Sequence, residues 1–388
     1  MFNVIIKTFI KDYNNTTNYK VRERYGIVCS VLSIICNTIM VIFKLIFGYW
    51  IHSVALLADG LNNLSDVGSN MATLFGFKLA SKHPDSDHPY GHGRYEYIAG
   101  LVISFLILMV GFSSAKESLM KIIEPSQILF EWSAVAVIVV SIFIKLWMYY
   151  FNDQAGKMIE STSLKAAGQD SLNDVLTSSA TLVSVFLSLL TDLPVDGIIG
   201  LIVSIIVLKS GVEIFQDTVN PLLGMAPNKE LVDEIHEYVM RYNKVIGIHD
   251  FMMHDYGPGR KYLTFHAEVD SHEDIVEVHE QLDRLERDIL RHFNILTTIH
   301  MDPIDITDER TLKLKMKVAY IVDEINSEYS IHDFRVVYGK TQSKLIFDVL
   351  IPSNDTTKHR IIRKQIVEKV KELDVNYHCV IQVEHSYI

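Results

Sequence analysis

The stretch LLADGLNNLSDVGSN, residues 56–70, places two carboxylates and three asparagines inside an apolar segment long enough to cross a bilayer. Ionisable side chains are costly in a membrane, so where they occur they usually mark an ion or substrate pathway. Five polar residues recur every three or four positions, which puts them on one face of a helix, with Asn63 at its edge. They are Asp59, Asn62, Asp66, Asn70 and Thr73.

A helix interface held by polar side chains is the simplest explanation of such a face. That explanation accounts for the asparagines. It accounts poorly for two carboxylates, because an unpaired carboxylate in the membrane is strongly unfavourable. The acids therefore indicate a function beyond helix packing.

A second acidic face lies at residues 163–188, SLKAAGQDSLNDVLTSSATLVSVFLS. Its polar residues again follow helical spacing, and two carboxylates lie four residues apart. They are Asp170, Asp174, Thr177, Thr181, Ser184 and Ser188. We expect no intramembrane lysine or arginine to pair with these acids or with Asp66, because Lys165, the nearest, lies toward the cytoplasmic end.

A bound cation is the least costly way to hold several such oxygens together. The two faces, brought together, offer Asn62, Asp66, Asp170 and Asp174 as ligands. An all-oxygen set favours Mn²⁺, Mg²⁺ or Fe²⁺, whereas a zinc preference is usually signalled by histidine or cysteine. Because carboxylates also bind protons, a metal and protons can compete for this site.

Six candidate membrane spans are predicted in the first half of the 388-residue chain. They cover about residues 26–50, 52–80, 96–120, 131–151, 163–190 and 195–216. Lys44, Lys145 and Lys209 fall inside three of them, where we expect their ammonium groups to extend to the membrane surface. The basic residues of the N-terminal arm and of the 78–94 loop predict that both termini are cytoplasmic.

The chain therefore divides into an N-terminal arm (1–25), a six-helix membrane domain (26–220) and a charged second half. After Pro221 the pattern is that of a small α+β domain (221–308). VDEI and IHDF, at 232 and 248, recur in the same order at 322 and 331. We interpret residues 309–388 as a second copy of the domain. The net charge of −11, mostly in this half, argues against a nucleic-acid partner.

The loop KHPDSDHPYGHGRYEY, residues 82–97, is rich in histidine and aspartate. His88 and His92 lie four residues apart with Asp85 and Asp87 nearby, a set that can hold a transition metal. Incidental solvated histidines in a tight Gly/Pro loop are the alternative.

Histidines also gather in the soluble half. His249, His266 and His300 are predicted at corresponding ends of strands, with Asp302 beside the last. In the second copy His332 and His385 persist, while Asp348 replaces His266. Metal sensing is possible in both copies, and single surface histidines such as His272 and His292 need no explanation.

These motifs resemble the cation diffusion facilitator family over about residues 20–305. NNLSDVGSN is similar to its second-span motif, DSLND (170–174) to its fifth-span D-x-x-x-D form, and HPYGHGRYEYIAG to its loop after the second span. The resemblance implies a six-helix bundle with a ferredoxin-like cytoplasmic domain. It also implies a homodimer in the cell membrane that exchanges divalent metals for protons.

The resemblance assigns the transport site to Asn62, Asp66, Asp170 and Asp174. An Asn/Asp/Asp/Asp quartet looks like the manganese-exporting branch, with Zn²⁺, Fe²⁺ and Co²⁺ as alternative substrates. It places the loop site at His88 and His92 with Asp85 or Asp87, and leaves Asp59 as a possible accessory acid. Regulatory metal ligands fall on His249, His266, His279, His300 and Asp302.

Two other classes of protein remain open from the sequence. Aspartate-rich helices also hold Mg²⁺-diphosphate in membrane prenyltransferases, but those enzymes have more spans and basic residues near the acids. A metal sensor that does not transport would use only the soluble half and leave the two polar membrane faces unexplained. We therefore expect a secondary transporter and not an enzyme.

Overall fold

The computed structural model describes residues 2–16, 18–50, 54–124, 132–188 and 194–386. The side chains of 54–56, 58–59, 61–62 and 134 lie outside this description. The chain forms two compact units. The first comprises 1–225 with 255–261, and the second 226–254 with 262–388.

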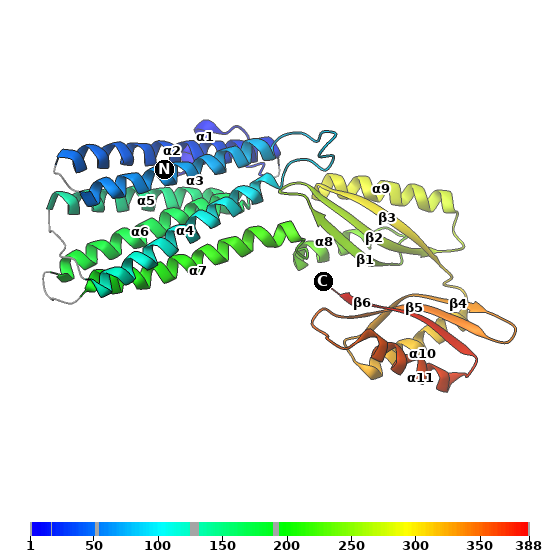
Figure 1. The fold of residues 1–388 in the computed structure, drawn as a ribbon. Helices are drawn as coiled ribbons and strands as arrows, with labels where there is room; N and C mark the ends of the chain where they lie inside the picture. The colour runs from blue at the N-terminus through cyan, green and yellow to red at the C-terminus, as the bar shows by residue number, and fades with distance from the viewer. Residues whose placement is uncertain (1, 17, 51–53, 125–131, 189–193, 387–388) are drawn as a thin grey trace. The chain divides into compact units, whose positions relative to one another are not determined.

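The first unit is a bundle of long helices (Figure 1). A short helix, α1 (Phe2–Phe9), precedes them. Within the bundle α2 packs along α3, α4 along α7, and α5 along α6. The long helices are α2 (Tyr19–Trp50), α3 (Val54–Ala80), α4 (Tyr95–Ile123), α5 (Trp132–Met158), α6 (Thr162–Ser188) and α7 (Val195–Leu223).

Four of these helices, α2, α4, α5 and α7, are long and apolar enough to cross a membrane. The other two, α3 and α6, have 27 residues each and carry the two predicted acidic faces. Their polar faces lower their mean hydropathy, so membrane crossing by all six helices stays a prediction.

The α4–α7 pair shows why small residues lie in these spans. A Cβ added at Gly111 of α4 would lie 2.9 Å from Leu208 Cδ2 of α7. The same atom added at Gly211 of α7 would lie 2.9 Å from Leu108 Cδ2 of α4. Each glycine thus leaves room for a leucine side chain of the other helix, which allows the two helix backbones to approach closely.

The second unit contains the element order helix, strand, strand, helix, strand twice (Figure 1). Each set forms one three-stranded sheet, in the orders β1-β2-β3 and β4-β5-β6. The first set is α8 (Lys229–Val239), β1 (Gly247–Asp255), β2 (Lys261–Asp270), α9 (Ile275–Phe293) and β3 (Ile295–Ile304). The second is α10 (Glu309–Ile325), β4 (Ser330–Tyr338), β5 (Ser343–Pro352), α11 (His359–Leu373) and β6 (Tyr377–Ser386).

The two sets bury matching positions. In β2 the buried side chains are Leu263, Phe265, Ala267 and Val269, and in β5 they are Leu345, Phe347, Val349 and Ile351. Alternation with period two sends these side chains into the core beneath each sheet. Amphipathic helices supply the rest of each core; α9, for example, buries Val278, Leu282, Leu285 and Ile289.

The repeated IHDF segment also adopts the same unusual backbone in both sets. Asp250 and Asp333 each have φ 51°, in the left-handed region that aspartate tolerates better than most residues. In the second set the ladder between β4 and β5 shifts register between His332 and Arg335, as at a bulge. The shared irregularity supports the interpretation of a duplicated domain, which remains a prediction.

Candidate functional site

The polar face of α3 is buried within the helical bundle. Asp66 is 7% exposed, and Asn70 and Thr73 are also buried. The Asn70 side chain donates to the Asp66 carbonyl oxygen at 2.7 Å, and the Thr73 hydroxyl donates to that of Ser69 at 3.2 Å. Both side chains bond to their own helix, which leaves the Asp66 carboxylate available for groups on other helices.

Asp59 and Asn62 lie on the same helix, about two turns and one turn before Asp66, respectively. Their backbone is helical, but their side chains lie outside the described part of the chain. The accessory role of Asp59 and the ligand role of Asn62 therefore stay predictions.

The acids of α6 lie on one face, as their spacing predicts. Asp170 and Asp174 are half-buried. The hydroxyls of Thr177 and Thr181 each donate at 3.0 Å to the carbonyl four residues earlier on α6. As on α3, the hydroxyl groups of these threonines form hydrogen bonds within their own helix, while the carboxylates face other helices.

Lys145 of α5 joins the two acidic helices. Its Nζ lies 2.7 Å from Asp66 Oδ2 and 2.5 Å from Asp174 Oδ2, and its charge also interacts with Asp170. Lys145 is 4% exposed. The expectation that no intramembrane cation pairs with these acids was therefore wrong. It took Lys165 as the nearest base and expected Lys145 to extend to the membrane surface, whereas the Lys145 side chain extends inward to two carboxylates.

Lys44 of α2 also turns inward. It is buried, and its Nζ donates to Asn63 Oδ1 at 2.8 Å. The expectation that Lys44 and Lys145 extend to the membrane surface was wrong for both, because each finds an oxygen acceptor inside the bundle. Lys209 of α7 does have an exposed side chain, at 78%, and lies 3.6 Å from Glu213.

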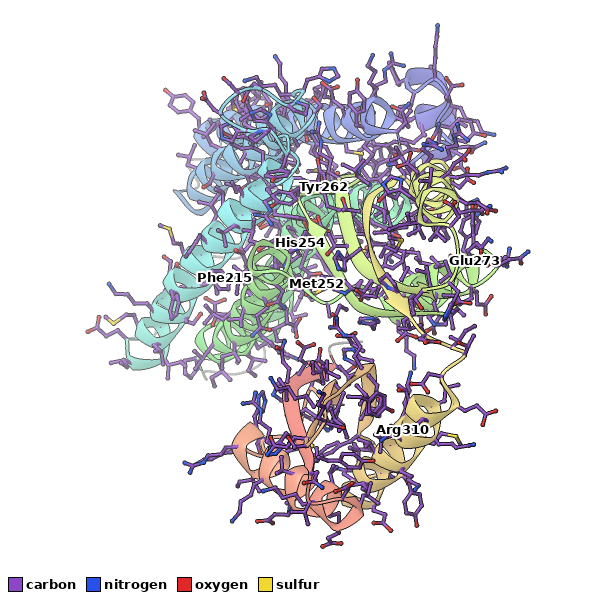
Figure 2. The ribbon with its side chains drawn as sticks, turned by 90° about the vertical axis from the view of Figure 1, so that its right-hand side faces the viewer. Phe215, Met252, His254, Tyr262, Glu273 and Arg310 are labelled. Atoms are coloured by element: carbon purple, nitrogen blue, oxygen red, sulfur yellow. The ribbon has the colours of Figure 1, made fainter. Side chains whose placement is uncertain are left out.

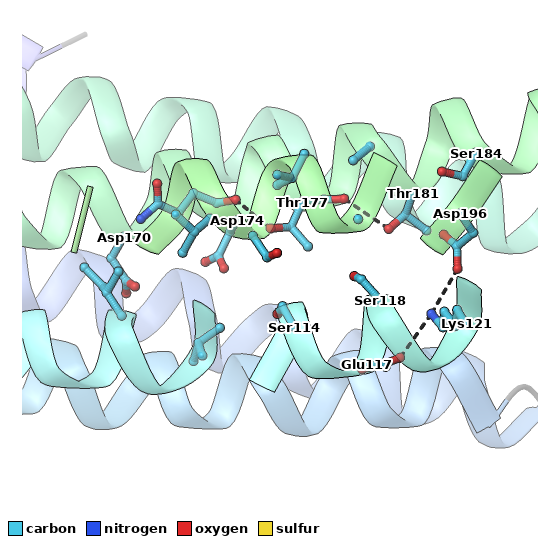
Figure 3. Close-up of a pocket in the computed structure, with 18 residues that line it drawn as sticks. Ser114, Glu117, Ser118, Lys121, Asp170, Asp174, Thr177, Thr181, Ser184 and Asp196 are labelled. Carbon is cyan, nitrogen blue, oxygen red and sulfur yellow. Dashed lines mark hydrogen bonds and ion pairs between the residues drawn. The ribbon is translucent and has the colours of Figure 1, made fainter. Parts of the chain in front are cut away.

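A cavity of about 180 Å³ adjoins the acids of α6 (Figure 3). It lies among α4, α6 and α7, and hydroxyl groups line much of its length. Asp170 and Asp174 lie toward one end, while Lys121 bridges Glu117 and Asp196 at 3.0 Å each toward the other. The hydroxyl-bearing lining residues are Ser114, Ser118, Thr177, Thr181, Ser184 and Ser204.

The 82–97 loop gathers three of its predicted ligands. Ligand atoms of Asp85, His88 and His92 lie within 4.8 Å of one another. Asp87 is exposed and lies outside this group, so the geometry favours Asp85 as the acid. Lys82 Nζ lies 2.6 Å from Asp85 Oδ2, and this bond holds the pKa of Asp85 well below its usual range.

A second histidine–aspartate group lies on the first sheet of the second unit. Asp302 Oδ2 of β3 lies 2.9 Å from His266 Nδ1 of β2 and 3.2 Å from His249 Nε2 of β1. His300 is exposed, with its ring 4.5 Å from that of His266. His279, predicted as a fifth ligand, lies exposed on α9 and joins no such group among the described residues.

His249 is the buried centre of this group. Its side chain is 8% exposed, and neither ring nitrogen has a well-aligned hydrogen bond within the described residues. Burial alone would lower the pKa of His249, but the carboxylates of Asp250 and Asp302 outweigh burial and raise it. The imidazole of His249, whose Nδ1 lies 3.4 Å from Asp250 Oδ2, in turn lowers the pKa of Asp250. His254, farther along β1, is exposed (Figure 2).

His332, the equivalent of His249 in the repeated IHDF segment, extends this group. Its ring lies 4.8 Å from that of His249, and His249, Asp250 and His332 form a further set of convergent ligand atoms. Sequence reasoning named neither Asp250 nor this pairing. The matched IHDF tetrapeptides were the available signal, but they do not show that the two copies meet there.

Comparison with known proteins gives a consistent pattern. Residues 30–223 match the model of the cation efflux transmembrane domain, and residues 227–304 match that of the cation efflux protein cytoplasmic domain. An uncharacterised transporter of Methanocaldococcus jannaschii is 32% identical over 250 residues, covering 64% of this chain and 88% of the relative.

Two further relatives carry names that describe cation efflux. The manganese efflux system protein MneS of Bacillus subtilis is 28% identical over 283 residues, covering 71% of this chain and 95% of the relative. The cation-efflux pump FieF of Escherichia coli is 25% identical over 288 residues, covering 73% of this chain and 96% of the relative.

Proposed function

This chain belongs to the cation diffusion facilitator family, on its manganese-exporter-like branch, and we propose that it exports Mn²⁺ from the cytoplasm in exchange for protons. It is a cation efflux transporter of the membrane, with a cytoplasmic domain of the type that supports a homodimer. The proposal concerns the substrate, the counter-ion and the residues that bind them.

One observation carries the proposal. Carboxylates from α3 and α6 converge on a single buried ammonium, although the helices around them are largely apolar. Asp66 and Asp174 are therefore placed to share one positive charge, which is what two ligands of a bound metal must do. Asp170 lies one turn from Asp174 and lines the adjoining cavity.

Manganese is favoured by the donor atoms. Asp66, Asp170 and Asp174 offer only oxygen, and Asn62 would add an amide oxygen. Hard and borderline divalent cations accept such ligands, whereas zinc sites more often include nitrogen or sulfur. MneS, the relative named as a manganese efflux system protein, supports the same choice.

The cavity offers a route between this site and one end of the bundle. In the predicted orientation, with both termini in the cytoplasm, the end marked by Lys121 and Asp196 faces outward. In the proposed cycle, metal enters from the cytoplasm, reaches the carboxylates, and leaves through this cavity. Protons compete with the metal for carboxylate oxygens that Lys145 does not bond, such as those of Asp170, because metal and protons bind the same type of oxygen.

The two histidine–aspartate groups would serve as further metal sites. We propose that Asp85, His88 and His92 hold a metal in the loop between α3 and α4. We further propose that His249, His266 and Asp302, with His332 of the second domain copy, hold a regulatory metal. Imidazole and carboxylate ligands in such sets suit borderline transition metals.

Transport by the purified full-length chain in proteoliposomes tests the proposed function. Mn²⁺, Zn²⁺, Fe²⁺ and Co²⁺ are supplied side by side with an imposed proton gradient. We expect Mn²⁺ flux to be fastest and to collapse when the proton gradient is removed. Equal flux with and without the gradient would refute proton exchange, and faster Zn²⁺ than Mn²⁺ flux would refute the substrate assignment.

A further inference from the structure

Lys145 occupies the point at which the two acidic helices meet. Its ammonium contacts Asp66 of α3 and Asp174 of α6, at 2.7 and 2.5 Å. We propose that Lys145 is a resident cation that takes the place of the metal in the empty carrier and is displaced when metal binds. The inference rests on the proposed function and adds a residue and a step to it.

The contacts themselves favour this role over simple helix packing. Lys145 lies on α5, so its ammonium links carboxylates of two other helices, and it does so with the same oxygen type that would bind the metal. Both carboxylates are largely buried, with side chains 11% and 21% exposed. A buried carboxylate needs a positive partner, and in this conformation Lys145 is that partner for two of them at once.

A divalent metal and the ammonium cannot both occupy this position. Two cations bound to the same carboxylate oxygens would lie within a few ångströms of each other, where repulsion is strong in a low-dielectric interior. Metal binding to Asp66 and Asp174 therefore requires Lys145 to withdraw. When Lys145 returns, it completes the ion pairs that the departing metal leaves open.

This exchange of cations has a consequence for the transport cycle. An exporter must return without metal to the inward-facing state after each release. Without Lys145, the return would carry Asp66 and Asp174 through the bundle with neither metal nor ammonium beside them. The metal-loaded carrier does not need Lys145, because the metal itself neutralises the acids.

The same competition favours divalent over monovalent cations. A free monovalent ion carries the charge of the ammonium, but the ammonium is attached to the site and so has a high effective concentration there. A divalent ion attracts the carboxylates about twice as strongly at equal distance. Lys145 is in this sense a specificity-determining residue.

The test separates exchange from net transport in full-length protein reconstituted into liposomes. Exchange is measured with Mn²⁺ on both sides and a radioactive tracer on one. Net transport is measured with Mn²⁺ on one side only, so that each cycle includes an empty return. Equilibrium binding of Mn²⁺ in detergent is the third readout. Lys145→Met and Lys145→Gln remove the charge, and Lys209→Met is the matched control on an exposed lysine.

For both Lys145 variants we expect net transport to fall by about 10²-fold and exchange to fall far less, because only net transport includes a return that leaves buried acids unpaired. Mn²⁺ should bind at least about tenfold more tightly, since no resident cation competes. Lys209→Met should behave as wild type in all three measurements. Lys145→Gln keeps the test available where the methionine variant does not fold.

Three results would overturn the inference. They are unchanged net transport in the Lys145 variants, Mn²⁺ binding that is unchanged or weaker, and loss of exchange together with net transport in both variants. The last would make Lys145 a structural residue. Failure of the proposed function gives a different result, because wild-type protein would then show no Mn²⁺ exchange at all.

Discussion

The proposed membrane site and the histidine–aspartate group of the second unit hold their charges in opposite ways. In the helical bundle, Asp66 and Asp174 present only oxygens and are bridged by an ammonium from a third helix. In the cytoplasmic group, His249 is buried beside Asp302 without a well-aligned hydrogen bond in the described part of the chain. The first arrangement suits a cation that must be displaced in every cycle, and the second suits one that stays bound.

The largest expected effect is at the membrane site. Asp174→Asn should reduce Mn²⁺ flux in proteoliposomes by about 10²-fold or more, because the substitution removes a charged oxygen ligand from the proposed metal site, and even the loss of a ligand's support typically costs about 10–100-fold. Asp217→Asn, which changes an exposed acid of α7, is the matched control and should retain flux. Unchanged Mn²⁺ flux in Asp174→Asn, with the dimer intact, would show that the transported metal does not bind between α3 and α6.

A selectivity change sharpens the contrast between oxygen and nitrogen ligands. Asn62→His should raise the Zn²⁺-to-Mn²⁺ flux ratio by about tenfold, because imidazole suits a tetrahedral zinc site. The two fluxes are measured in the same proteoliposome preparation. An unchanged ratio would show that Asn62 does not contact the transported metal.

The cytoplasmic group should bind metal without controlling whether transport occurs. His249→Ala should weaken Zn²⁺ binding at this group by about tenfold or more, the scale seen when ligands or their supports are lost, while Mn²⁺ flux continues. His254→Ala, an exposed histidine on the same strand, is the control. Calorimetry on the full-length protein measures the Zn²⁺ binding. Loss of all Mn²⁺ flux in His249→Ala would show that transport requires this group, contrary to the prediction.

The contribution of the second domain copy is expected to be smaller. His332→Ala should weaken Zn²⁺ binding at the cytoplasmic group by a few-fold, because His266 and Asp302 remain. His378→Ala, on β6, provides the matched control within the same domain copy. Identical titration curves for the two variants would assign the group to the first copy alone.

The smallest effect concerns a contact independent of metal. The Tyr242 hydroxyl donates to Asp288 Oδ2 at 2.7 Å and lowers the pKa of that carboxyl. A depressed pKa contributes stability above the ordinary aspartate range, and this contribution is lost as pH falls through the folded-state value. Tyr242→Phe should therefore slightly reduce thermal stability at neutral pH and leave it unchanged at low pH. A larger loss of thermal stability at low pH than at neutral pH would contradict the predicted pH dependence.

Much of the membrane site was predictable because helical spacing alone places acids on shared faces. Asp66, Asp170 and Asp174 follow from the period of 3.6 residues. The partner of these acids did not follow, because the inward direction of Lys145 depends on how α5 is rotated against α3 and α6. The ammonium of a lysine inside an apolar span can extend to the membrane surface or pair with a buried carboxylate. The sequence alone does not determine which of the two occurs.

The cytoplasmic domains show the same division. Alternating apolar residues and the repeated tetrapeptides predicted two α+β sets, and the structure has that element order twice. The choice of Asp85 over Asp87 depends on the turn geometry of the loop, which spacing does not determine. The approach of His332 to His249 is a tertiary contact between residues 83 positions apart, so no local pattern predicted it.

A structure of the full-length protein with Mn²⁺, located by its anomalous scattering, tests the central claim most directly. We predict Mn²⁺ within about 2.0–2.6 Å of oxygens of Asp66, Asp170 and Asp174, the range of hard-cation bonds to oxygen. Lys145 Nζ should have left both carboxylates. Manganese found only at the loop or cytoplasmic histidines, with Lys145 still bound to Asp66 and Asp174, would contradict the account.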